Sequence, residues 1–236
     1  MKNQDIFKRY EIKYLISYEQ EKLIRQEIEK YIRGDEYGKS SVCNIYYDTP
    51  TNLLIRRSIE KPVYKEKLRV RSYGIASAES KVYIELKKKY NDVVYKRRIS
   101  QSYENAQNYL EHNGNPSVKS QITNEIDYFC SLYENIAPAM FISYEREAFY
   151  AKDDDNFRIT FDRNILWRND ELSLDLGIYG NPLLSCNETL MEIKTSLSIP
   201  LWMSHILNEN KIYKTSFSKY GNAYKNSLMK GLYVYA

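Results

Sequence analysis

Basic side chains recur at every second position in one strand-like segment, residues 64–73. Its apolar residues, Leu68 and Val70, fall on the even positions. Four of the five odd positions are basic: Lys65, Lys67, Arg69 and Arg71. Because successive side chains of a strand point to opposite faces, this segment predicts one basic and one apolar face. Such an array suits phosphate, which Arg binds through paired donors and Lys binds as a point charge.

Three further segments, 81–89, 157–162 and 187–195, alternate in the same way. Their apolar positions are Val82, Ile84, Leu86, Phe157, Ile159, Phe161, Met191 and Ile193. Opposite them are Tyr83, Glu85, Lys87, Lys89, Arg158, Thr160, Asp162, Glu188, Glu192 and Lys194. In two other segments, 92–99 and 139–151, a basic residue shares its parity with apolar ones: Lys96 and Arg98 with Val94, and Arg146 with Ile142, Tyr144 and Ala148. Parity leaves the orientation of those two strands open.

The rest of the chain supplies strands and helices that would position these faces. Further strands are expected at 8–16 and 41–48, with a possible hairpin turn at Tyr90-Asn91-Asp92. A helix should begin at Ser17, with an apolar stripe of Leu23, Ile24, Ile28, Tyr31 and Ile32. Other helices are expected near 51–58, 102–112, 117–135, 200–210 and 217–230. Strands interspersed with helices predict an α+β fold with a largely antiparallel sheet.

Two arrangements of the charged faces are open. They can meet water, as in half-solvated antiparallel sheets. Alternatively, they can line the inside of a closed barrel whose apolar outer surface packs against helices. The long helices favour the second arrangement, since they must bury their own apolar stripes. Converging cations would then need an anion to offset their repulsion, and that anion would be a phosphate polyanion.

The charge distribution also points to a polyanionic ligand. The formal net charge is only +4. However, residues 56–98 hold 14 basic and 5 acidic side chains, whereas residues 99–192 hold 6 basic and 16 acidic ones. This segregation favours an anionic partner. A nucleic acid is not expected, because the 24 tyrosines are spread along the whole chain and form no basic surface with stacking aromatics.

Several other chemistries are not indicated. Cys43, Cys130 and Cys186 are too far apart for a CxxC site and are expected to be buried small hydrophobes. Gly38-Lys39-Ser40 resembles the end of a P-loop, but Arg33 replaces the required glycine, and a helix is expected before it and a strand after it. The run 153–155 of three aspartates is interpreted as a solvated turn. No apolar run approaches the ~20 residues of a membrane span, and no signal peptide is seen, so a cytoplasmic location is expected.

A set of motifs in order along the chain is similar to the VTC domain, the catalytic module of polyphosphate polymerases among the triphosphate tunnel metalloenzymes. The motifs are Tyr10-Glu11-Ile12-Lys13-Tyr14, Ile45-Tyr46-Tyr47-Asp48, Leu68-Arg69-Val70-Arg71-Ser72-Tyr73-Gly74, Glu85-Leu86-Lys87, Tyr144-Glu145-Arg146, Phe157-Arg158-Ile159-Thr160-Phe161-Asp162, Met191-Glu192-Ile193-Lys194 and Phe217-Ser218-Lys219-Tyr220. The resemblance implies one domain over residues 1–236, and the SPX domain and membrane segments of the eukaryotic proteins are not expected within these residues. It also implies an antiparallel eight-stranded β-barrel, or tunnel, with surrounding helices.

The resemblance also implies a set of site residues. The catalytic residues would be Lys13, Arg69, Arg71, Lys87, Arg146, Arg158 and Lys219. Further substrate contacts would come from Lys96, Tyr144, Lys194 and Ser218. Glu192 would bind the metal, Mn²⁺ or Mg²⁺. Most of these residues are the ones that parity alone places on charged faces.

Two departures from the related patterns stand out. The ExExK motif of CYTH-type triphosphatases corresponds here to Arg9-Tyr10-Glu11-Ile12-Lys13, so the first glutamate is absent, which argues against a CYTH-like two-metal arrangement. Eukaryotic VTC domains resemble Lys-Phe-Ser-Lys where this chain has Ser216-Phe217-Ser218-Lys219. Lys214 is a candidate replacement for the missing lysine.

The leading hypothesis is a phosphotransferase that moves the γ-phosphate of ATP, or of another nucleoside triphosphate, onto a growing polyphosphate chain. The alternatives are a hydrolase of triphosphate or nucleoside triphosphate with the same fold, and a non-catalytic polyphosphate-binding module. Pyrophosphate or triphosphate is a further candidate ligand. A membrane partner is compatible with the resemblance but is not encoded in these residues.

Overall fold

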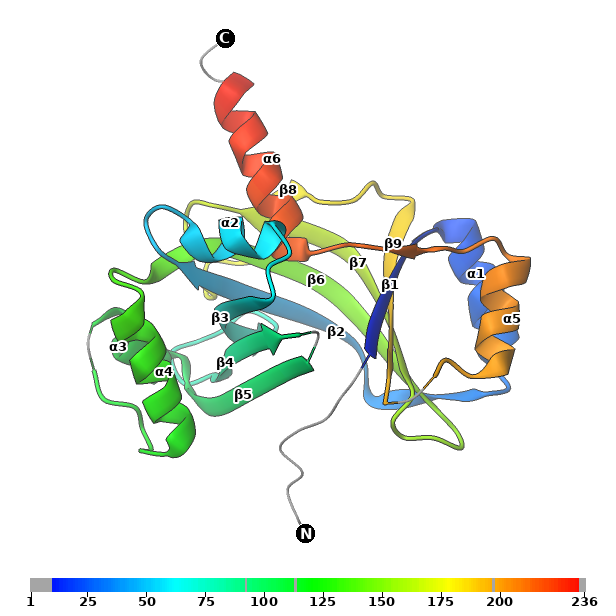
Figure 1. The fold of residues 1–236 in the computed structure, drawn as a ribbon, viewed down its shortest axis with the longest axis horizontal. Helices are drawn as coiled ribbons and strands as arrows, with labels where there is room; N and C mark the ends of the chain where they lie inside the picture. The colour runs from blue at the N-terminus through cyan, green and yellow to red at the C-terminus, as the bar shows by residue number, and fades with distance from the viewer. Residues whose placement is uncertain (1–9, 92, 113, 197, 234–236) are drawn as a thin grey trace. The chain divides into compact units, whose positions relative to one another are not determined.

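A ten-stranded sheet and six helices make up the part of the chain that the computed structural model describes, which is residues 10–91, 93–112, 114–196 and 198–233 (Figure 1). The strands are β1 (Tyr10–Ser17), β2 (Ile32–Asp48), β3 (Tyr64–Tyr73), β4 (Lys81–Tyr90), β5 (Val93–Ser102), β6 (Ala137–Ala151), β7 (Arg158–Arg168), β8 (Asn181–Pro182), β9 (Glu188–Thr195) and β10 (Lys214–Thr215). The helices are α1 (Tyr18–Ile28), α2 (Leu53–Ile59), α3 (Tyr103–Glu111), α4 (Gln121–Leu132), α5 (Leu201–Glu209) and α6 (Lys219–Tyr233).

The strand order in the sheet is β10-β1-β9-β7-β6-β2-β3-β4-β5, with β8 paired to β7. The β1–β9, β9–β7, β2–β3, β3–β4 and β4–β5 pairs are antiparallel. Eight of the strands are long, and only β8 and β10 have two residues. The predicted α+β class with a largely antiparallel sheet is therefore confirmed. Among the described strands, the hydrogen-bonded path ends at β10 and β5 and does not close into a ring.

The chain forms two compact units. Unit 1 comprises residues 1–41, 144–165 and 182–218, and unit 2 comprises residues 42–143, 166–181 and 219–236. The long strands β2, β6 and β7 contribute residues to both units. The expectation of a single domain stays a prediction.

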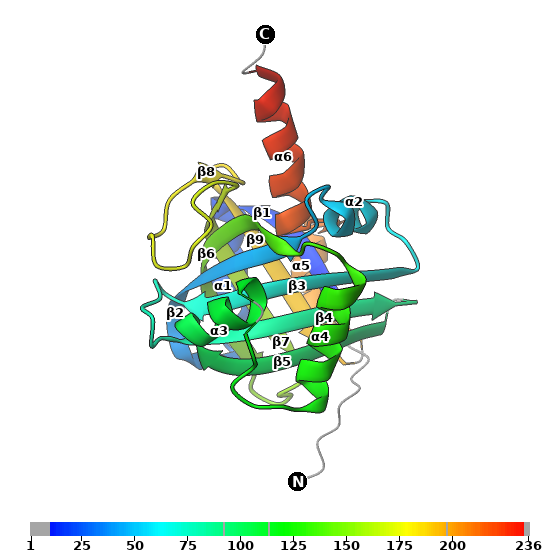
Figure 2. The ribbon, with the colours of Figure 1, turned by 90° about the vertical axis from the view of Figure 1, so that its left-hand side faces the viewer.

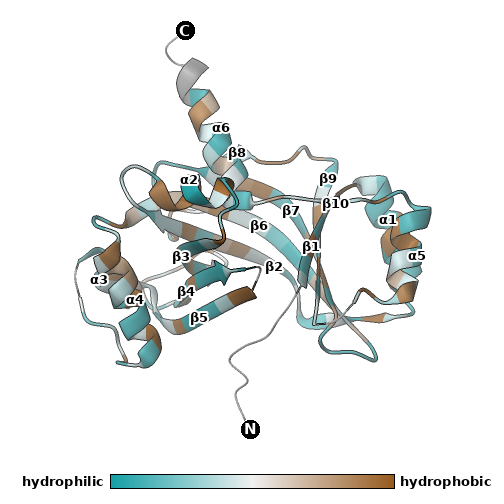
Figure 3. Ribbon diagram, in the orientation of Figure 1, coloured by the Kyte–Doolittle hydropathy of each residue, from teal (hydrophilic) through white to brown (hydrophobic). Residues whose placement is uncertain are grey.

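In unit 1, helices α1 and α5 pack on one face of the strands. Tyr14 and Ile16 of β1, Phe161 of β7 and Ile193 of β9 join residues of both helices in one buried cluster. Both helices carry hydrophobic and hydrophilic residues along their length (Figure 3). As predicted, α1 begins after Ser17, whose side chain accepts from the Gln20 backbone N–H while the Gln20 side chain accepts from the Ser17 N–H.

In unit 2, helices α3 and α4 lie in front of β3, β4 and β5 (Figure 2). Leu68, Val70 and Ile84 of the strands are buried with Ile126 and Phe129 of α4. These strand residues are the apolar positions that parity identifies. The opposite, charged face of the same strands is therefore turned away from α3 and α4.

Several local predictions need correction. Helix α1 ends at Ile28, so Tyr31 and Ile32 lie outside it, and Ile32 begins β2. Strand β2 starts nine residues earlier than the predicted strand at 41, and Gly38-Lys39-Ser40 lies inside it. No strand–loop–helix context for a P-loop exists there. The strand was missed because charged residues and two glycines mask its alternation.

Other predictions hold or lie outside the described residues. Strand β3 has the predicted bounds, 64–73. Cys43 is buried as predicted, whereas Cys186 is exposed, which corrects its assignment to the core. The aspartate run at 153–155 forms the turn between β6 and β7, where Asp155 pairs with Arg33. Residues 8 and 9 of the first predicted strand and Asp92 of the predicted hairpin turn are not among the described residues.

Candidate functional site

The cross-strand register builds one continuous polar face on β3, β4 and β5 of unit 2. Arg69 lies opposite Glu85, and Glu85 lies opposite Arg98. In the next row, Lys87 lies between Lys67 and Lys96. Directly paired residues point to the same face. The register therefore brings together four predicted site residues, Arg69, Arg71, Lys87 and Lys96, and it resolves the open orientation of β5.

Glu85 is the centre of this face, and only 1% of its side chain is exposed. The Arg69 guanidinium contacts its Oε2 atom, from Nη2 at 2.7 Å and from Nε at 2.8 Å. Lys96 Nζ lies 2.6 Å from Oε1, with Arg98 Nε at 3.4 Å from the same oxygen and Arg71 Nε at 3.9 Å from Oε2. Four cations thus share one buried carboxylate.

These contacts shift two pKa values. Burial opposes the ionisation of Glu85, but Arg69, Arg71 and Lys96 outweigh burial and hold its pKa well below the ordinary value. Burial lowers the pKa of Lys96 to about 8; Arg69 and Arg71 add to this effect, whereas Glu85 opposes it. Lys96 is therefore a cation near neutral pH that can be neutralised in mildly alkaline solution.

Residues of β2, which pairs with β3 on the side away from β4, contact two arginines of this face, and α6 supports these β2 residues. Arg69 Nη1 donates to the Tyr46 hydroxyl at 3.0 Å. The Tyr46 ring stacks on Tyr220 with 4.6 Å between centroids, and the Tyr220 hydroxyl donates to Asp48 at 2.9 Å. Arg71 Nε donates to Asn44 Oδ1 at 2.9 Å. Asn44, Tyr46, Asp48, Glu85 and Tyr220 were not predicted as site residues, although motifs quoted above contain all of them except Asn44.

Unit 1 carries a second polar face, built by β1, β9 and β7. Lys13 of β1 lies opposite Glu192 of β9, and Glu192 lies opposite Thr160 of β7. In the next row, Lys194 lies between Glu11 and Arg158. The predicted residues Lys13, Arg158, Glu192 and Lys194 therefore share one face, opposite the side covered by α1 and α5.

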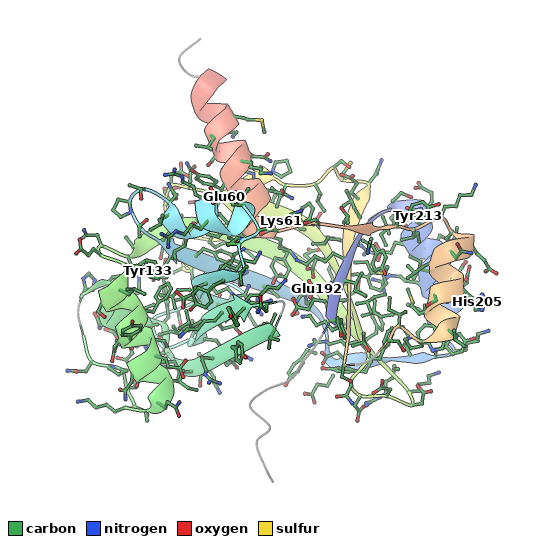
Figure 4. The ribbon with its side chains drawn as sticks, in the orientation of Figure 1. Glu60, Lys61, Tyr133, Glu192, His205 and Tyr213 are labelled. Carbon is green, nitrogen blue, oxygen red and sulfur yellow. The ribbon has the colours of Figure 1, made fainter. Side chains whose placement is uncertain are left out.

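Glu192, which is labelled in Figure 4, contacts two lysines of this face. Its side chain is 8% exposed; Lys194 Nζ lies 2.9 Å from Oε1, and Lys13 Nζ lies 3.7 Å from Oε2. The Lys13 ammonium also donates to the carbonyl oxygen of Phe217 at 2.7 Å. The carboxylate thus stays largely buried yet is balanced by positive charge.

Two arginines of unit 1 are fixed by acidic partners. Arg146 of β6 donates from Nε and Nη2 to the two oxygens of Asp162, at 2.6 and 2.7 Å. Its guanidinium lies 5.0 Å from the centroid of the Tyr144 ring. Although burial opposes its charge, Tyr144 and Asp162 raise the pKa of Arg146 well above its ordinary value. Arg158 donates to Asp35 at 3.1 Å.

The residues around position 216 lie at the join between β10 and α6. Ser218 precedes α6, and Lys219 is its first residue. Lys214 pairs with Tyr14, whereas Thr215 pairs with Lys13. Since cross-strand partners point to one face, Lys214 lies on the Tyr14 side and not on the Lys13 side.

The residues that could hold a divalent cation are few. Within the described residues, no group of three or more His, Cys, Asp or Glu is placed to bind a metal ion. Glu192 nevertheless offers a hard carboxylate oxygen. The buried Thr160 hydroxyl, in register with it, has no hydrogen-bond partner among the described residues. Mg²⁺ and similar ions need only one or two carboxylates when waters and substrate phosphates complete their coordination. The donor set fits an ion of that kind.

A profile of the VTC domain matches residues 8–228. The chain belongs to the VTC domain family. The match includes every predicted site residue, from Lys13 to Lys219. A comparison with curated proteins gave no match.

Solved structures with the fold of this VTC domain include two bacterial proteins described as candidate adenylate cyclases. The one from Bacillus halodurans has a TM-score of 0.55 at 15% identity, over 91% of this chain and 94% of that one. The one from Vibrio parahaemolyticus has a TM-score of 0.51 at 13% identity, over 91% and 96%. A candidate adenylyl cyclase from Hippeastrum, described as having a dominant triphosphatase activity, has a TM-score of 0.52 at 15% identity, over 92% and 95%. The VTC domain thus shares its fold with these three proteins.

Proposed function

We propose that this VTC domain is a metal-dependent polyphosphate polymerase. It would transfer the γ-phosphoryl group of ATP, or of another nucleoside triphosphate, onto the end of a growing polyphosphate chain. Membership of the VTC family supports the reaction. The observation that carries the proposal is the face of β3–β5, where the register gathers Arg69, Arg71, Lys87 and Lys96. The location of the protein and any membrane partner stay predictions; no helix among the described residues is both long and apolar enough to cross a bilayer.

The basic residues would act by binding and charge stabilisation. Phosphoryl transfer needs alignment of the attacking and leaving oxygens and stabilisation of charge on the transferred group, with little covalent help from the protein. The guanidinium groups of Arg69, Arg71, Arg146 and Arg158 would donate to phosphate oxygens. Ammonium groups would offset the charge along the chain, and these would come from Lys13, Lys87, Lys96, Lys194 and Lys219. Tyr144 and Ser218 would supply hydroxyl contacts.

Glu192 would hold Mn²⁺ or Mg²⁺ together with phosphate oxygens of the substrate. Such an ion, when bound, neutralises charge on the phosphates and orients them. The contacts of Glu192 with Lys13 and Lys194 would hold its carboxylate in place in the absence of substrate. No side-chain nucleophile is required, since a phosphate oxygen of the growing chain is the acceptor.

Hydrolysis is the second candidate, with water as acceptor. It is favoured by the triphosphatase activity described for the structurally similar Hippeastrum protein. A binding module without catalysis is the third candidate, and Ser216, at the position of an expected lysine, is the feature that favours it. The three candidates differ in their products and not in the cations they use.

Product analysis distinguishes the three. The purified protein is incubated with ATP and Mn²⁺, and the products are resolved by gel electrophoresis and assayed for orthophosphate. Long-chain polyphosphate supports the polymerase, orthophosphate alone supports the hydrolase, and retained polyphosphate binding without turnover supports the binding module. Charge reversal by Arg71→Glu or Glu192→Lys should abolish turnover, whereas the same reversals at exposed positions, Lys119→Glu and Glu134→Lys, should not.

A further inference from the structure

The carboxylate of Glu85 contacts four cations. Lys96 and Arg98, both from β5, lie within 3.4 Å of its Oε1 atom. Arg69 and Arg71, both from β3, lie within 3.9 Å of its Oε2 atom. One negative charge on the central strand β4 therefore joins four positive charges from the two flanking strands.

The cations are far more numerous than the carboxylate can neutralise. Glu85 leaves a net charge of about +3 among the five groups, which is a strong local attraction for a phosphate chain. Arg and Lys have long side chains with many rotamers, and like charges this close would turn apart. A buried anion at the centre offsets this repulsion and keeps the cations on one face before any ligand arrives.

We propose that Glu85 is a positioning residue of the phosphate site: it pre-organises Arg69, Arg71, Lys96 and Arg98 for a phosphate chain without contacting that chain. The proposal rests on the proposed function, because it assigns phosphate as the ligand of this face. A pre-organised site loses less side-chain entropy on binding, so its affinity is higher than that of the same charges held loosely. Arg98, absent from the family-derived set, joins the binding face on this basis.

A positioning role and simple charge attraction predict opposite effects of one substitution. Glu85→Gln removes a negative charge and raises the local positive charge from about +3 to about +4. By attraction alone, the variant would bind a polyanion more tightly. If Glu85 positions the cations, the affinity of the variant for a polyanion should fall by about tenfold or more. This is the lower end of the loss in affinity that follows when a group that orients ligand-binding residues is removed.

The pH dependence of phosphate affinity gives a second measurement, which a purely structural role of Glu85 would leave unchanged. The charged groups that face Lys96 are Glu85 and Lys87 of β4, Lys67, Arg69 and Arg71 of β3, and Arg98 of β5. Of these, only Glu85 favours the charged form of Lys96. Its removal therefore moves the alkaline loss of phosphate affinity to lower pH than in the wild-type protein.

The test is calorimetric titration of the full chain with inorganic tripolyphosphate between pH 6.5 and 9.5. The proteins are wild type, Glu85→Gln, Glu85→Asp and the control Glu125→Gln, which removes a carboxylate that pairs with Arg97 and Lys88. Glu85→Asp keeps the charge but shortens the reach by one methylene. If Glu85→Gln does not give a cooperative thermal unfolding transition, the Glu85→Asp variant tests the positioning role in its place.

We expect Glu85→Gln and Glu85→Asp to bind tripolyphosphate more weakly than the wild type. The affinity of Glu85→Gln should also decrease at a lower pH than that of the wild type. Glu125→Gln should behave like the wild type. Equal or tighter binding by Glu85→Gln, or wild-type affinity in Glu85→Asp, would overturn the positioning role and leave the proposed function standing. A wild-type protein that does not bind tripolyphosphate would contradict the proposed function, and the positioning role with it.

Discussion

Lys13 and Glu192 are direct cross-strand partners on β1 and β9, with Lys13 Nζ 3.7 Å from Glu192 Oε2. The pair joins a predicted phosphate-binding cation to the predicted metal-binding carboxylate on one face. A carboxylate with only 8% of its side chain exposed would be costly without such a partner. The pair with Lys13 therefore balances the buried charge of the carboxylate that we propose as the metal ligand.

The first prediction concerns Glu192→Gln. The substitution keeps the shape of the side chain but removes its charge, so the metal-dependent rate of ATP consumption should fall by about 10²-fold or more. The rate is measured across a Mn²⁺ titration, because weaker metal binding shifts the half-maximal concentration upward. Glu134→Gln, an exposed residue after α4, is the matched control. An unchanged metal dependence in Glu192→Gln would remove it from the metal site.

A second prediction concerns the pair of Arg146 with Asp162, whose side chains are 15% and 0% exposed. Asp162→Ala leaves the guanidinium buried without its bidentate acceptor, so the free energy of unfolding should fall by about 3–5 kcal/mol. Urea denaturation measures the change. Asp155→Ala removes the acceptor of the exposed Arg33 pair and should cause a much smaller change. Similar losses of unfolding free energy in the two variants would show that the buried pair contributes no more to stability than the exposed pair.

The third prediction follows from Lys96, whose pKa is lowered to about 8. Below that pH the group is charged, and it becomes neutral as the pH rises through 8. A phosphate ligand favours the charged form, so affinity should decrease above pH 8, and binding near pH 8.5 should take up protons. Calorimetry in two buffers with different ionisation enthalpies measures this uptake. Lys96→Met should lower the uptake, and an unaltered uptake would assign the titration to another group.

Asp48 gives a fourth prediction. Its carboxylate accepts from the backbone N–H groups of Leu54 and Ile55 at the start of α2 and from the Tyr220 hydroxyl of α6. Asp48→Ala removes these three bonds and a fourth, from the Thr49 backbone N–H, at a residue that is 1% exposed, so a loss of about 1–3 kcal/mol in unfolding free energy is expected. Tyr220→Phe removes one of the bonds and should cost less. Equal losses in the two variants would mean that the α2 contacts contribute nothing.

Sequence patterns predicted the faces of the strands better than the site. The period of two in β3 predicted the sides of Leu68 and Arg69, and Ser17 indicated the start of α1. The role of Glu85 could not be predicted in this way. Parity identifies the face of a residue on its own strand, whereas the four contacts of Glu85 depend on the register of three strands.

The side of Lys96, the first half of β2 and the strand β10 could not be predicted because their residues show no clear alternation. The side of Lys96 was undecided because β5 mixes valines and cations on one parity, and only its pairing with Lys87 decides it. The first half of β2 was missed because Gly34 and Gly38 interrupt a charged stretch. The two-residue strand β10 has too few residues for any periodicity, although its pairing decides the side of Lys214.

The most direct test of the proposed reaction is phosphorus NMR of the purified chain incubated with ATP and Mg²⁺. A polymerase should deplete the γ-phosphate signal of ATP and produce ADP together with a growing signal from phosphates inside a polyphosphate chain. Glu192→Gln should abolish both changes. Conversion of the γ-phosphate into orthophosphate alone, with no internal chain phosphate at any time, would contradict polymerisation.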